Sequence, residues 1–411
     1  MMVTAPESSE TVDWTGRRCA AEVGAVAHGG HCVARVDGRV VFVRHALPGE
    51  RVVIEITSDG GGSFCRGDAV EILTPSPDRV EPACPVSGPG GCGGCDWQHA
   101  DPAAQRGVKA AVVAEQLRRL AGVQWPVEVA ELPGGPLRWR RRARLAVDKQ
   151  GRPGFRANHS HRVIPVQDCP ITSSRALDGV LGRKFTPGGE VEVAEDGEGT
   201  AHLAELVPRR SGRRGAPVPL RGDGVAVYRA AGRSWRVSAH GFWQVHRAAA
   251  DVLAATVAEF ADAQPGGAAW DLYGGVGLFG SVLAEQVGTD GSVLVVESTK
   301  QAMADGEANL ADLPQVRFAR ARVDKLLAGR VRPAHPDVVV LDPPRSGAGR
   351  AVVDGIATAQ PTRVVYVACD PAALARDVAL LQARDYQLTM LRAYDAFPMT
   401  HHVECVALLE L

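Results

Sequence analysis

The segment from Ala268 to Gly280 limits the possible folds of this chain more than any other. It reads as an apolar strand that turns through glycines into a helix, and the next apolar strand ends at Glu297. Such glycines let the backbone approach a ligand closely, and an acidic residue at the second strand end suits two ribose hydroxyls. From about Ser238 to Leu411 strands and helices alternate, which predicts an α/β Rossmann-like domain. The glycine-rich turn alone fits a dinucleotide enzyme and a methyltransferase equally well.

A second strand-end motif, from Val338 to Gly347, separates these two classes. Its apolar strand is followed by a double proline that fixes the direction of Asp342. Asp-Pro-Pro at this place resembles the substrate-side loop of S-adenosylmethionine-dependent methyltransferases. Members that methylate an exocyclic amino nitrogen usually have an aromatic residue after the prolines, whereas this chain has Arg345. A carbon acceptor attacked through a thiol adduct is therefore favoured over an amine.

The thiol for such an adduct is Cys369, which follows the next apolar strand, Val364 to Ala368. A lone cysteine at such a place is more often a small apolar residue that fills a strand. The glycine-rich turn and the Asp-Pro-Pro loop upstream favour a nucleophile instead.

Five motifs occur together in an order that is specific for one family. They are Gly241–His246, Asp271–Gly277, Leu341–Arg345, Ala368–Asp377 and Phe397–Glu404. With them the chain resembles, over nearly its whole length, the bacterial RNA uridine-5-methyltransferase family, in the branch with an iron–sulfur cluster and a TRAM domain. The resemblance implies an enzyme similar to the 23S rRNA (uracil-C5)-methyltransferases. It also implies a multidomain fold: an N-terminal TRAM or OB-like β-barrel, a central mixed α+β domain with an iron–sulfur loop, and the C-terminal Rossmann-like domain.

Uracil C5 is too weak a nucleophile to attack a methyl sulfonium unless a thiolate first adds at C6. Cys369 is the predicted nucleophile, and the resemblance implies that Glu404 removes the C5 proton afterwards. His401 and His402 are expected to be structural or to contact the substrate. Ribosomal RNA is favoured, with transfer RNA as the alternative. An RNA-binding iron–sulfur protein without catalysis and a cytosine-5 enzyme with the same thiol chemistry also stay open.

The resemblance also implies a set of residues that line the pocket of S-adenosylmethionine. They are Gln244, Tyr273, Glu297, Asp324 and Asp342. Glu297 and Asp342 have independent support because both end predicted strands. Without the resemblance, Gln244 and Asp324 read equally well as polar surface residues.

The chain departs from the usual pattern of this family at several positions. Gly274 stands where a cysteine is often found, and Ala368 and Asp370 replace the usual serine and asparagine around Cys369. A carboxylate beside the thiol is expected to raise the thiol pKa and oppose thiolate formation. Arg376 is a candidate for the compensating positive charge.

Three cysteines within twelve residues, spaced by glycines, predict a metal site together with a fourth cysteine further on. The four are Cys84, Cys92, Cys95 and Cys169. Four thiolates also suit zinc, and spacing alone does not exclude that metal. The Cys-Gly-Gly-Cys-x-x-Gln-His string resembles the [4Fe-4S] motif of the family, although the seven residues between Cys84 and Cys92 are more than is usual there. The remaining cysteines outside the active site are expected to be packing or incidental thiols, namely Cys19, Cys32, Cys65 and Cys405.

The formal net charge of −1 hides an uneven distribution of arginines. Arginines interleaved with aromatic residues on short strands suit phosphate contacts and base stacking on single-stranded RNA. The candidates for RNA binding are Arg140, Arg142, Arg144, Arg156 and Arg345. A second run, Arg209, Arg210, Arg213 and Arg214, reads as a loop because of the glycine and proline around it.

The expected domain organisation has a disordered leader (1–11), the barrel (12–76), the central RNA-binding domain (77–237) and the catalytic domain (238–411). Turns are expected at Asp37-Gly38 and at Leu47 to Glu50. A helix from about 102 to 120 follows the cysteine loop, and 184–218 is expected to be a loop or insertion. Nine cysteines without a signal peptide or a long apolar run indicate a reducing cytoplasm, no membrane contact and no disulfide framework. A monomer is expected.

Overall fold

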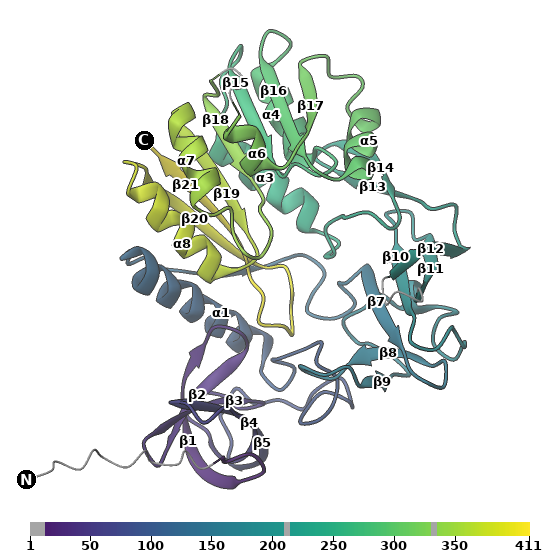
Figure 1. The fold of residues 1–411 in the computed structure, drawn as a ribbon, viewed down its shortest axis with the longest axis vertical. Helices are drawn as coiled ribbons and strands as arrows, with labels where there is room; N and C mark the ends of the chain where they lie inside the picture. The colour runs from purple at the N-terminus through teal and green to yellow at the C-terminus, as the bar shows by residue number, and fades with distance from the viewer. Residues whose placement is uncertain (1–12, 209–213, 330–334) are drawn as a thin grey trace, which may run out of the picture.

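The computed structural model describes residues 13–208, 214–329 and 335–411. The predicted leader, Arg209, Arg210 and Arg213 lie outside these residues, as does the side chain of Arg214. Figure 1 shows a barrel, a central sheet and a large α/β unit, with one long helix lying between the barrel and the α/β unit. No helix in the described part of the chain is long and apolar enough to cross a membrane.

The N-terminal unit is a closed barrel in which the strands follow the order β1-β2-β3-β5-β4. Its strands are β1 (Arg18–Ala27), β2 (His31–Val36), β3 (Arg39–Arg44), β4 (Arg51–Asp59) and β5 (Phe64–Thr74). Asp37 and Gly38 join β2 to β3 with φ angles of 48° and 79°, as a two-residue hairpin turn of the primed type requires. The second predicted turn closes by a 3.2 Å hydrogen bond from the Glu50 N–H to the Leu47 carbonyl. Both predicted turns are confirmed.

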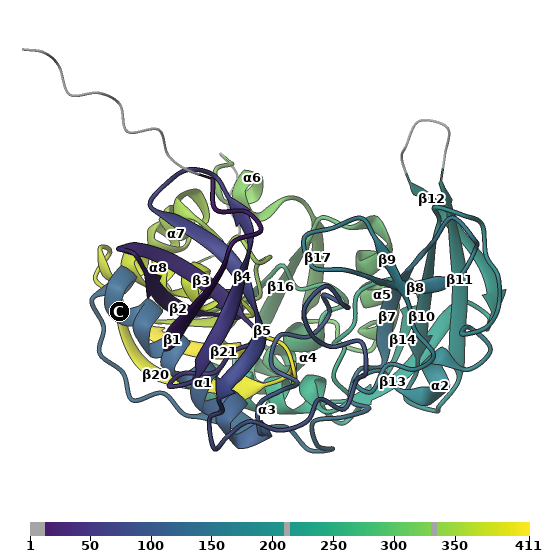
Figure 2. The same ribbon diagram turned by 90° about the horizontal axis from the view of Figure 1, so that it is seen from below.

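Helix α1 (Pro102–Gln116) connects the barrel to the rest of the molecule. It begins after Asp101, whose side chain accepts a hydrogen bond from the Ala103 N–H, and proline at the first helical position favours this start. The π-helical turn η1 (Leu117–Ala121) continues it, so the predicted helix is confirmed. Val112 packs into the barrel core, whereas the adjacent Val113 packs into the core of the α/β unit. The helix is therefore wedged between the two units (Figure 2).

The central unit is a six-stranded sheet in the order β12-β11-β10-β7-β8-β9. Its elements are β7 (Arg142–Val147), β8 (Pro153–Arg156), β9 (Val163–Pro165), the short helix α2 (Ser174–Leu177), β10 (Glu190–Glu195), β11 (Ala201–Pro208) and β12 (Arg214–Arg221). The prediction of a loop or insertion over 184–218 is wrong, because this segment contains β10, β11 and the start of β12. Its glycines, such as Gly188 and Gly199 with positive φ, make the turns between strands. Its prolines are Pro187, Pro208 and Pro217. Pro187 lies in the turn before β10, and Pro217 is tolerated because β12 is an edge strand.

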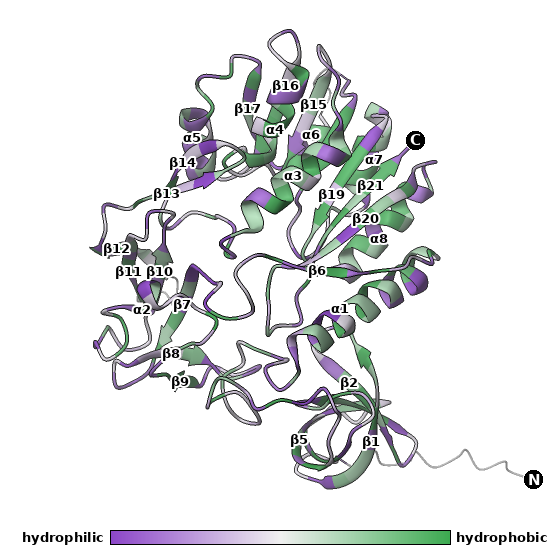
Figure 3. Cartoon of the chain, turned by 180° about the vertical axis from the view of Figure 1, so that it is seen from behind, coloured by the Kyte–Doolittle hydropathy of each residue, from purple (hydrophilic) through white to green (hydrophobic). Residues whose placement is uncertain are grey.

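The α/β unit is built on an eight-stranded sheet in the order β17-β16-β15-β18-β19-β21-β20-β6. Its strands are β6 (Val129–Glu131), β15 (Ala268–Leu272), β16 (Ser292–Glu297), β17 (Val316–Arg320), β18 (Val338–Leu341), β19 (Arg363–Ala368), β20 (Gln387–Asp395) and β21 (Glu404–Glu410). Its helices are α3 (Ala249–Ala261), α4 (Leu278–Val287), α5 (Lys300–Asn309), α6 (Val323–Leu327), α7 (Arg350–Ala359) and α8 (Pro371–Gln382). Strands β15 to β19 are parallel, whereas β21 runs antiparallel to both of its neighbours. The predicted Rossmann-like alternation is thus present, and Figure 3 shows how hydrophobic the inner strands β19 and β21 are.

Two segments that precede residue 238 pack with this α/β unit. The hairpin of β13 (Val225–Ala230) and β14 (Arg233–Ser238) inserts Tyr228 and Trp235 into the core beneath α3 and α4. Strand β6 extends the sheet beside β20. The chain therefore enters the α/β unit, leaves it for the central sheet and returns.

Candidate active site and cysteine cluster

The carboxyl ends of β15, β16 and β18 form one edge of the α/β sheet and present the glycine-rich turn. Glu297 accepts hydrogen bonds from the backbone N–H groups of Gly275 (3.2 Å) and Thr299 (2.5 Å). Asp271 is fully buried, accepts a 2.7 Å hydrogen bond from the Gly280 N–H and has one oxygen without a partner in the structure. Burial raises the pKa of Asp271 to about 7, and the carboxyls of Asp342 and Glu297 add to this effect.

The backbone of this turn leaves no room for a side chain at Gly274. A Cβ atom at Gly274 would lie 2.5 Å from Val295 Cγ1 and 2.7 Å from the Asp271 carboxylate. The cysteine that the family often has at this position therefore does not fit here without a local shift. Tyr273 has a φ of 62°, which is strained for a residue with a side chain and typical of ligand-binding turns.

The five predicted cofactor residues come from different elements. Burial raises the pKa of the Tyr273 phenol to about 12, and the Asp324 carboxylate adds to this effect. Asp324 is held by a bidentate ion pair with Arg322 at 3.0 Å. Asp342 directly follows β18, where its N–H donates to the Leu272 carbonyl. Gln244, in the loop between β14 and α3, is half-buried and has no hydrogen bond in the described part of the chain.

Cys369 directly follows β19, and Glu404 begins the adjacent antiparallel strand β21. The register of the two strands pairs Ala368 with Cys405, which sets Cys369 opposite Glu404. Glu404 is buried, with 4% of its surface exposed, and burial followed by the Asp342 carboxylate raises its pKa well above its usual value. Burial raises the pKa of the Cys369 thiol to about 12, with further contributions from Glu404 and Asp342, while Arg345 acts in the opposite direction. Burial and the neighbouring carboxylates thus favour the neutral thiol of Cys369 and the protonated form of Glu404.

Asp370, next to the predicted nucleophile Cys369, caps the start of helix α8 and also contacts the barrel. Its side chain accepts a hydrogen bond from the Ala373 N–H (2.8 Å) and lies 3.0 Å from Nε2 of His28, in the turn after β1. Burial alone would raise the pKa of Asp370, but these hydrogen bonds, helped by Arg376, bring it below its usual value. These contacts favour the ionised carboxylate beside the thiol. Arg376 acts on Asp370, whereas the positive charge that lowers the thiol pKa is that of Arg345.

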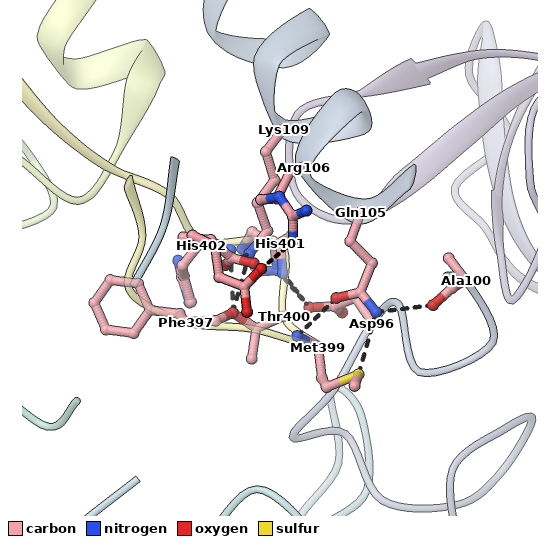
Figure 4. Close-up of polar contacts among 12 residues, drawn as sticks. Asp96, Ala100, Gln105, Arg106, Lys109, Phe397, Met399, Thr400, His401 and His402 are labelled. Carbon is pink, nitrogen blue, oxygen red and sulfur yellow. Dashed lines mark hydrogen bonds and ion pairs between the residues drawn. The ribbon is translucent and has the colours of Figure 1, made fainter. Parts of the chain in front are cut away.

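The loop before Glu404 contains the two histidines and is drawn in Figure 4. The His401 ring and its backbone N–H both contact the Asp96 carboxylate, at 2.7 and 3.0 Å. The His402 ring lies 4.1 Å from that of His401 and 5.8 Å from that of Phe397, measured between centroids. Burial lowers the pKa of His402 to about 3, and the charges of His401 and Arg345 add to this effect. His402 is therefore a neutral ring that cannot accept and keep a proton near neutral pH.

The four predicted metal ligands Cys84, Cys92, Cys95 and Cys169 line one cavity, together with Arg140, Phe155 and Ile171. The thiol sulfurs accept hydrogen bonds: Cys92 from the Gly94 N–H (3.4 Å), Cys95 from Gln98 (3.2 Å) and Cys169 from Thr172 (3.3 Å). Burial raises the pKa of Cys92 to about 11 and that of Cys95 to about 12, and the neighbouring thiols add to it. Within the described ranges, no three His, Cys, Asp or Glu side chains converge tightly enough to hold a single metal ion. The four thiols that share this cavity are a donor set that either an iron–sulfur cluster or a zinc ion takes.

Comparison with known proteins identifies the family. Residues 234–411 match the family described as tRNA (Uracil-5-)-methyltransferase, and residues 15–70 match the TRAM domain. An uncharacterised RNA methyltransferase of Streptomyces coelicolor is 44% identical over 434 residues, which cover 98% of this chain and 94% of that protein. The chain belongs to this family of RNA methyltransferases. An uncharacterised RNA methyltransferase of Streptomyces avermitilis is 43% identical to this chain over 427 residues, which cover 96% of this chain and 98% of that protein.

A solved structure supports the fold. The crystal structure of the Pyrococcus abyssi tRNA (uracil-54, C5)-methyltransferase in complex with S-adenosyl-L-homocysteine has a similar fold. The similarity extends over 95% of the present chain and 100% of the Pyrococcus abyssi chain. The TM-score is 0.72 at 22% sequence identity, an identity at which the similarity is one of fold. The predicted family, the predicted fold class and the prediction of an RNA methyltransferase enzyme are thereby confirmed. Family membership also supports S-adenosylmethionine as the cofactor and RNA as the substrate.

Most of the arginines predicted to bind RNA have partners inside the methyltransferase. Arg142 donates to Tyr228 Oη (2.9 Å) and to the carbonyls of Ala239 and Gly241 (2.7 and 2.5 Å), so it joins the central sheet to the α/β unit. Arg144 is paired with Glu192, and Arg156 lies 3.0 Å from Glu190. Arg140 lines the cysteine cavity and donates to the Arg142 carbonyl. Arg345 is exposed and has no hydrogen bond or ion pair within the described residues.

Sequence reasoning missed several residues that shape the site. His28, Asp96 and Lys109 contact catalytic segments roughly three hundred positions away in sequence, and no local pattern marks them. Phe242, beside the predicted Gln244, is the most exposed of the large hydrophobic side chains in the described residues, at 67%. The sequence could have indicated Phe242, because an aromatic residue that lies in a family motif and is not needed for the core is unusual.

Proposed function

We propose that the methyltransferase transfers a methyl group from S-adenosylmethionine to C5 of a uridine in 23S rRNA through a covalent bond between Cys369 and C6. The observation that carries the proposal is the register of β19 and β21, which sets Cys369 opposite Glu404 beside Asp342. A nucleophile, a proton acceptor and the cofactor-side carboxylate thus share one strand edge. The chemistry of uracil requires a nucleophile and a base acting on the same ring.

The reaction follows from these groups. The Cys369 thiol loses its proton to solvent water and the thiolate sulfur adds to C6, while the C5–C6 π electrons move to C5 and to the C4 carbonyl oxygen. S-adenosylmethionine, when bound, supplies the methyl group that C5 takes up and a positive sulfonium charge. Glu404 then accepts the C5 proton, the C5–C6 double bond re-forms and the thiolate leaves.

The protonation of Glu404 must change during this cycle. Burial and the Asp342 carboxylate raise its pKa and favour the protonated form, and a protonated carboxyl cannot act as the base. Methyl transfer converts the sulfonium into a neutral thioether before the C5 proton leaves, so the cofactor charge does not assist this step. Glu404 therefore has to lose its own proton before it can act as the base.

We assign Cys84, Cys92, Cys95 and Cys169 as ligands of a [4Fe-4S] cluster with a structural role, since the thiol chemistry needs no electron transfer. Their common cavity supports this assignment, and zinc remains the alternative. A catalytic thiol and thiolate ligands both need a reducing compartment, so we place the enzyme in the cytoplasm, as a monomer.

Ribosomal RNA is the substrate we favour, because the cluster and the TRAM domain accompany that activity in the branch that the sequence resembles. Transfer RNA is the second candidate, since the Pyrococcus abyssi protein of the same fold is a tRNA (uracil-54, C5)-methyltransferase. The RNA fragment that forms an adduct distinguishes them.

Trapping with 5-fluorouridine tests the proposal. Fluorine at C5 cannot be abstracted as a proton, so the Cys369 adduct accumulates on RNA that contains this base. We expect an adduct that resists denaturation, forms on 23S rRNA rather than tRNA and is absent from Cys369→Ala. No adduct with either RNA, despite binding of S-adenosylmethionine, would favour a binding protein without this catalysis.

A further inference from the structure

The loop between β20 and β21, residues 396–403, leads directly into Glu404 but is held mainly by elements outside the catalytic sheet. Figure 4 shows side chains of the cysteine loop and of α1 pointing at it. The N–H groups of Asp96 and Trp97 donate to the Met399 carbonyl at 2.9 and 3.0 Å. The loop therefore depends on the segment that follows Cys95.

Asp96 adds a side-chain contact to these two backbone hydrogen bonds. One of its oxygens accepts from the His401 N–H (3.0 Å) and lies 2.7 Å from the His401 ring nitrogen Nδ1. Barrel residues close in on the same carboxylate, since a Cβ atom at Gly30 would lie 2.8 Å from its carbon and Arg44 lies 3.6 Å from its other oxygen. The Asp96 carboxylate thus lies between the barrel and the 396–403 loop. It contacts His401, which is three residues before Glu404.

Helix α1 holds the other end of the loop through two buried polar side chains. The Gln105 amide accepts from the Met399 N–H (2.9 Å) and donates to the Ala100 carbonyl (2.9 Å). Lys109, with 1% of its surface exposed, lies 2.6 Å from Asp395 and donates to the Phe397 carbonyl (3.0 Å). Buried polar groups with all these partners restrict a segment to one conformation.

Met399 shows why the loop needs this support. Its φ is 69°, a conformation that costs free energy for a residue with a side chain. Its side chain packs with Cys95, Trp139 and Ile171 in a small core that also includes Cys169 at its edge. The strained residue therefore lies against two of the four cysteines of the cavity.

We propose that Asp96, Gln105 and Lys109 are positioning residues that fix the 396–403 loop and thereby the carboxylate of Glu404 for removal of the C5 proton. This inference rests on the proposed function of Glu404. The role is specific to removal of the C5 proton, because other elements hold Cys369 and the sheet edge at the ends of β15, β16 and β18. Because Asp96 follows Cys95 directly, filling of the cysteine site also orders this loop.

The test compares Asp96→Ala with Asp78→Ala, an exposed aspartate in the same connecting segment whose side chain does not contact the loop. Amide hydrogen exchange of the peptide covering 396–404 reports loop order without any need for activity. Adduct formation on 5-fluorouridine RNA reports the Cys369 step, and the lifetime of the adduct on ordinary RNA reports the step of Glu404. We expect Asp96→Ala to exchange faster in 396–404, to form the 5-fluorouridine adduct and to release ordinary RNA more slowly by about tenfold or more, as for a displaced catalytic group.

Gln105→Ala, which removes the acceptor for the Met399 N–H, is expected to give the same pattern if Asp96→Ala does not fold. Anaerobic removal of the metal with a chelator is expected to increase exchange of 396–404 in the wild-type enzyme. The positioning role would be overturned if both variants kept the wild-type rates of amide exchange and of RNA release. It would also be overturned if the variants lost both cofactor binding and adduct formation. Failure of the wild-type enzyme to form any adduct would instead contradict the proposed function, and the exchange measurement would still decide whether these residues hold the loop.

Discussion

The two halves of the proposed active site are built differently. The cofactor half, at the ends of β15, β16 and β18, is formed by neighbouring parallel strands and their own turns, as the contacts of Glu297 with Gly275 and Thr299 show. The uracil half, around Cys369 and Glu404, is supported by the barrel, the cysteine loop and α1 through His28, Asp96 and Lys109. The cofactor half can therefore form within the α/β unit, whereas the uracil half needs the assembled molecule.

Replacing the nucleophile should separate the two halves most strongly. Cys369→Ala removes the atom that adds to C6, so we expect methylation to fall on the order of 10⁴-fold or more. Binding of S-adenosylmethionine, measured by calorimetry, should stay at the wild-type level. Cys405→Ala serves as the matched control for a buried thiol on the adjacent strand, and methylation that survives in Cys369→Ala would contradict the assignment.

Removing the base should stop the reaction at a later point. In Glu404→Gln the C5 proton has no acceptor, so we expect turnover to fall by about 10²- to 10⁴-fold while the adduct on ordinary RNA accumulates. Gel analysis under denaturing conditions measures that adduct. A variant that is slow but never accumulates it would assign proton removal to another group.

The buried ion pair offers a test of stability in the uracil half. Lys109→Met leaves Asp395 buried without its partner, which we expect to lower the free energy of unfolding by about 3 to 5 kcal/mol. Urea titration followed by fluorescence measures this change, with exposed Lys149→Met as the control. Lys109→Met/Asp395→Asn should recover part of the loss, and equal stability of Lys109→Met and the wild type would show that the pair is not needed.

The charge beside the thiol should produce the smallest effect. Asp370→Asn removes a negative charge that raises the Cys369 pKa less than burial, Glu404 and Asp342 do, so the pKa should fall slightly and the rate of alkylation should rise at a fixed pH below it. The alkylation profile, read from the Cys369 peptide by mass spectrometry, should therefore shift to lower pH. A shift to higher pH would mean that the contact between Asp370 and His28 matters more than the charge.

The same contrast explains what the sequence could predict. Glu297, Asp342 and Cys369 each end a strand, and the carboxyl ends of parallel strands meet at one edge, so these positions follow from local patterns. The contacts of His28 with Asp370 and of Asp96 with His401 join residues separated by 342 and 305 positions, and no local pattern encodes them. Arg142 was expected to bind RNA because its run of arginines is basic, yet its guanidinium is used inside the fold. The strands within 184–218 were missed because the glycines and prolines of their turns and edge dominate the composition of that segment.

The most direct measurement is mass spectrometry of the adduct formed by Glu404→Gln on ordinary RNA with S-adenosylmethionine, after digestion with nuclease and protease. The account predicts a Cys369 peptide linked to a uridine nucleotide that carries one additional methyl group. Methylated RNA without any linked peptide, or a link to another cysteine, would contradict it.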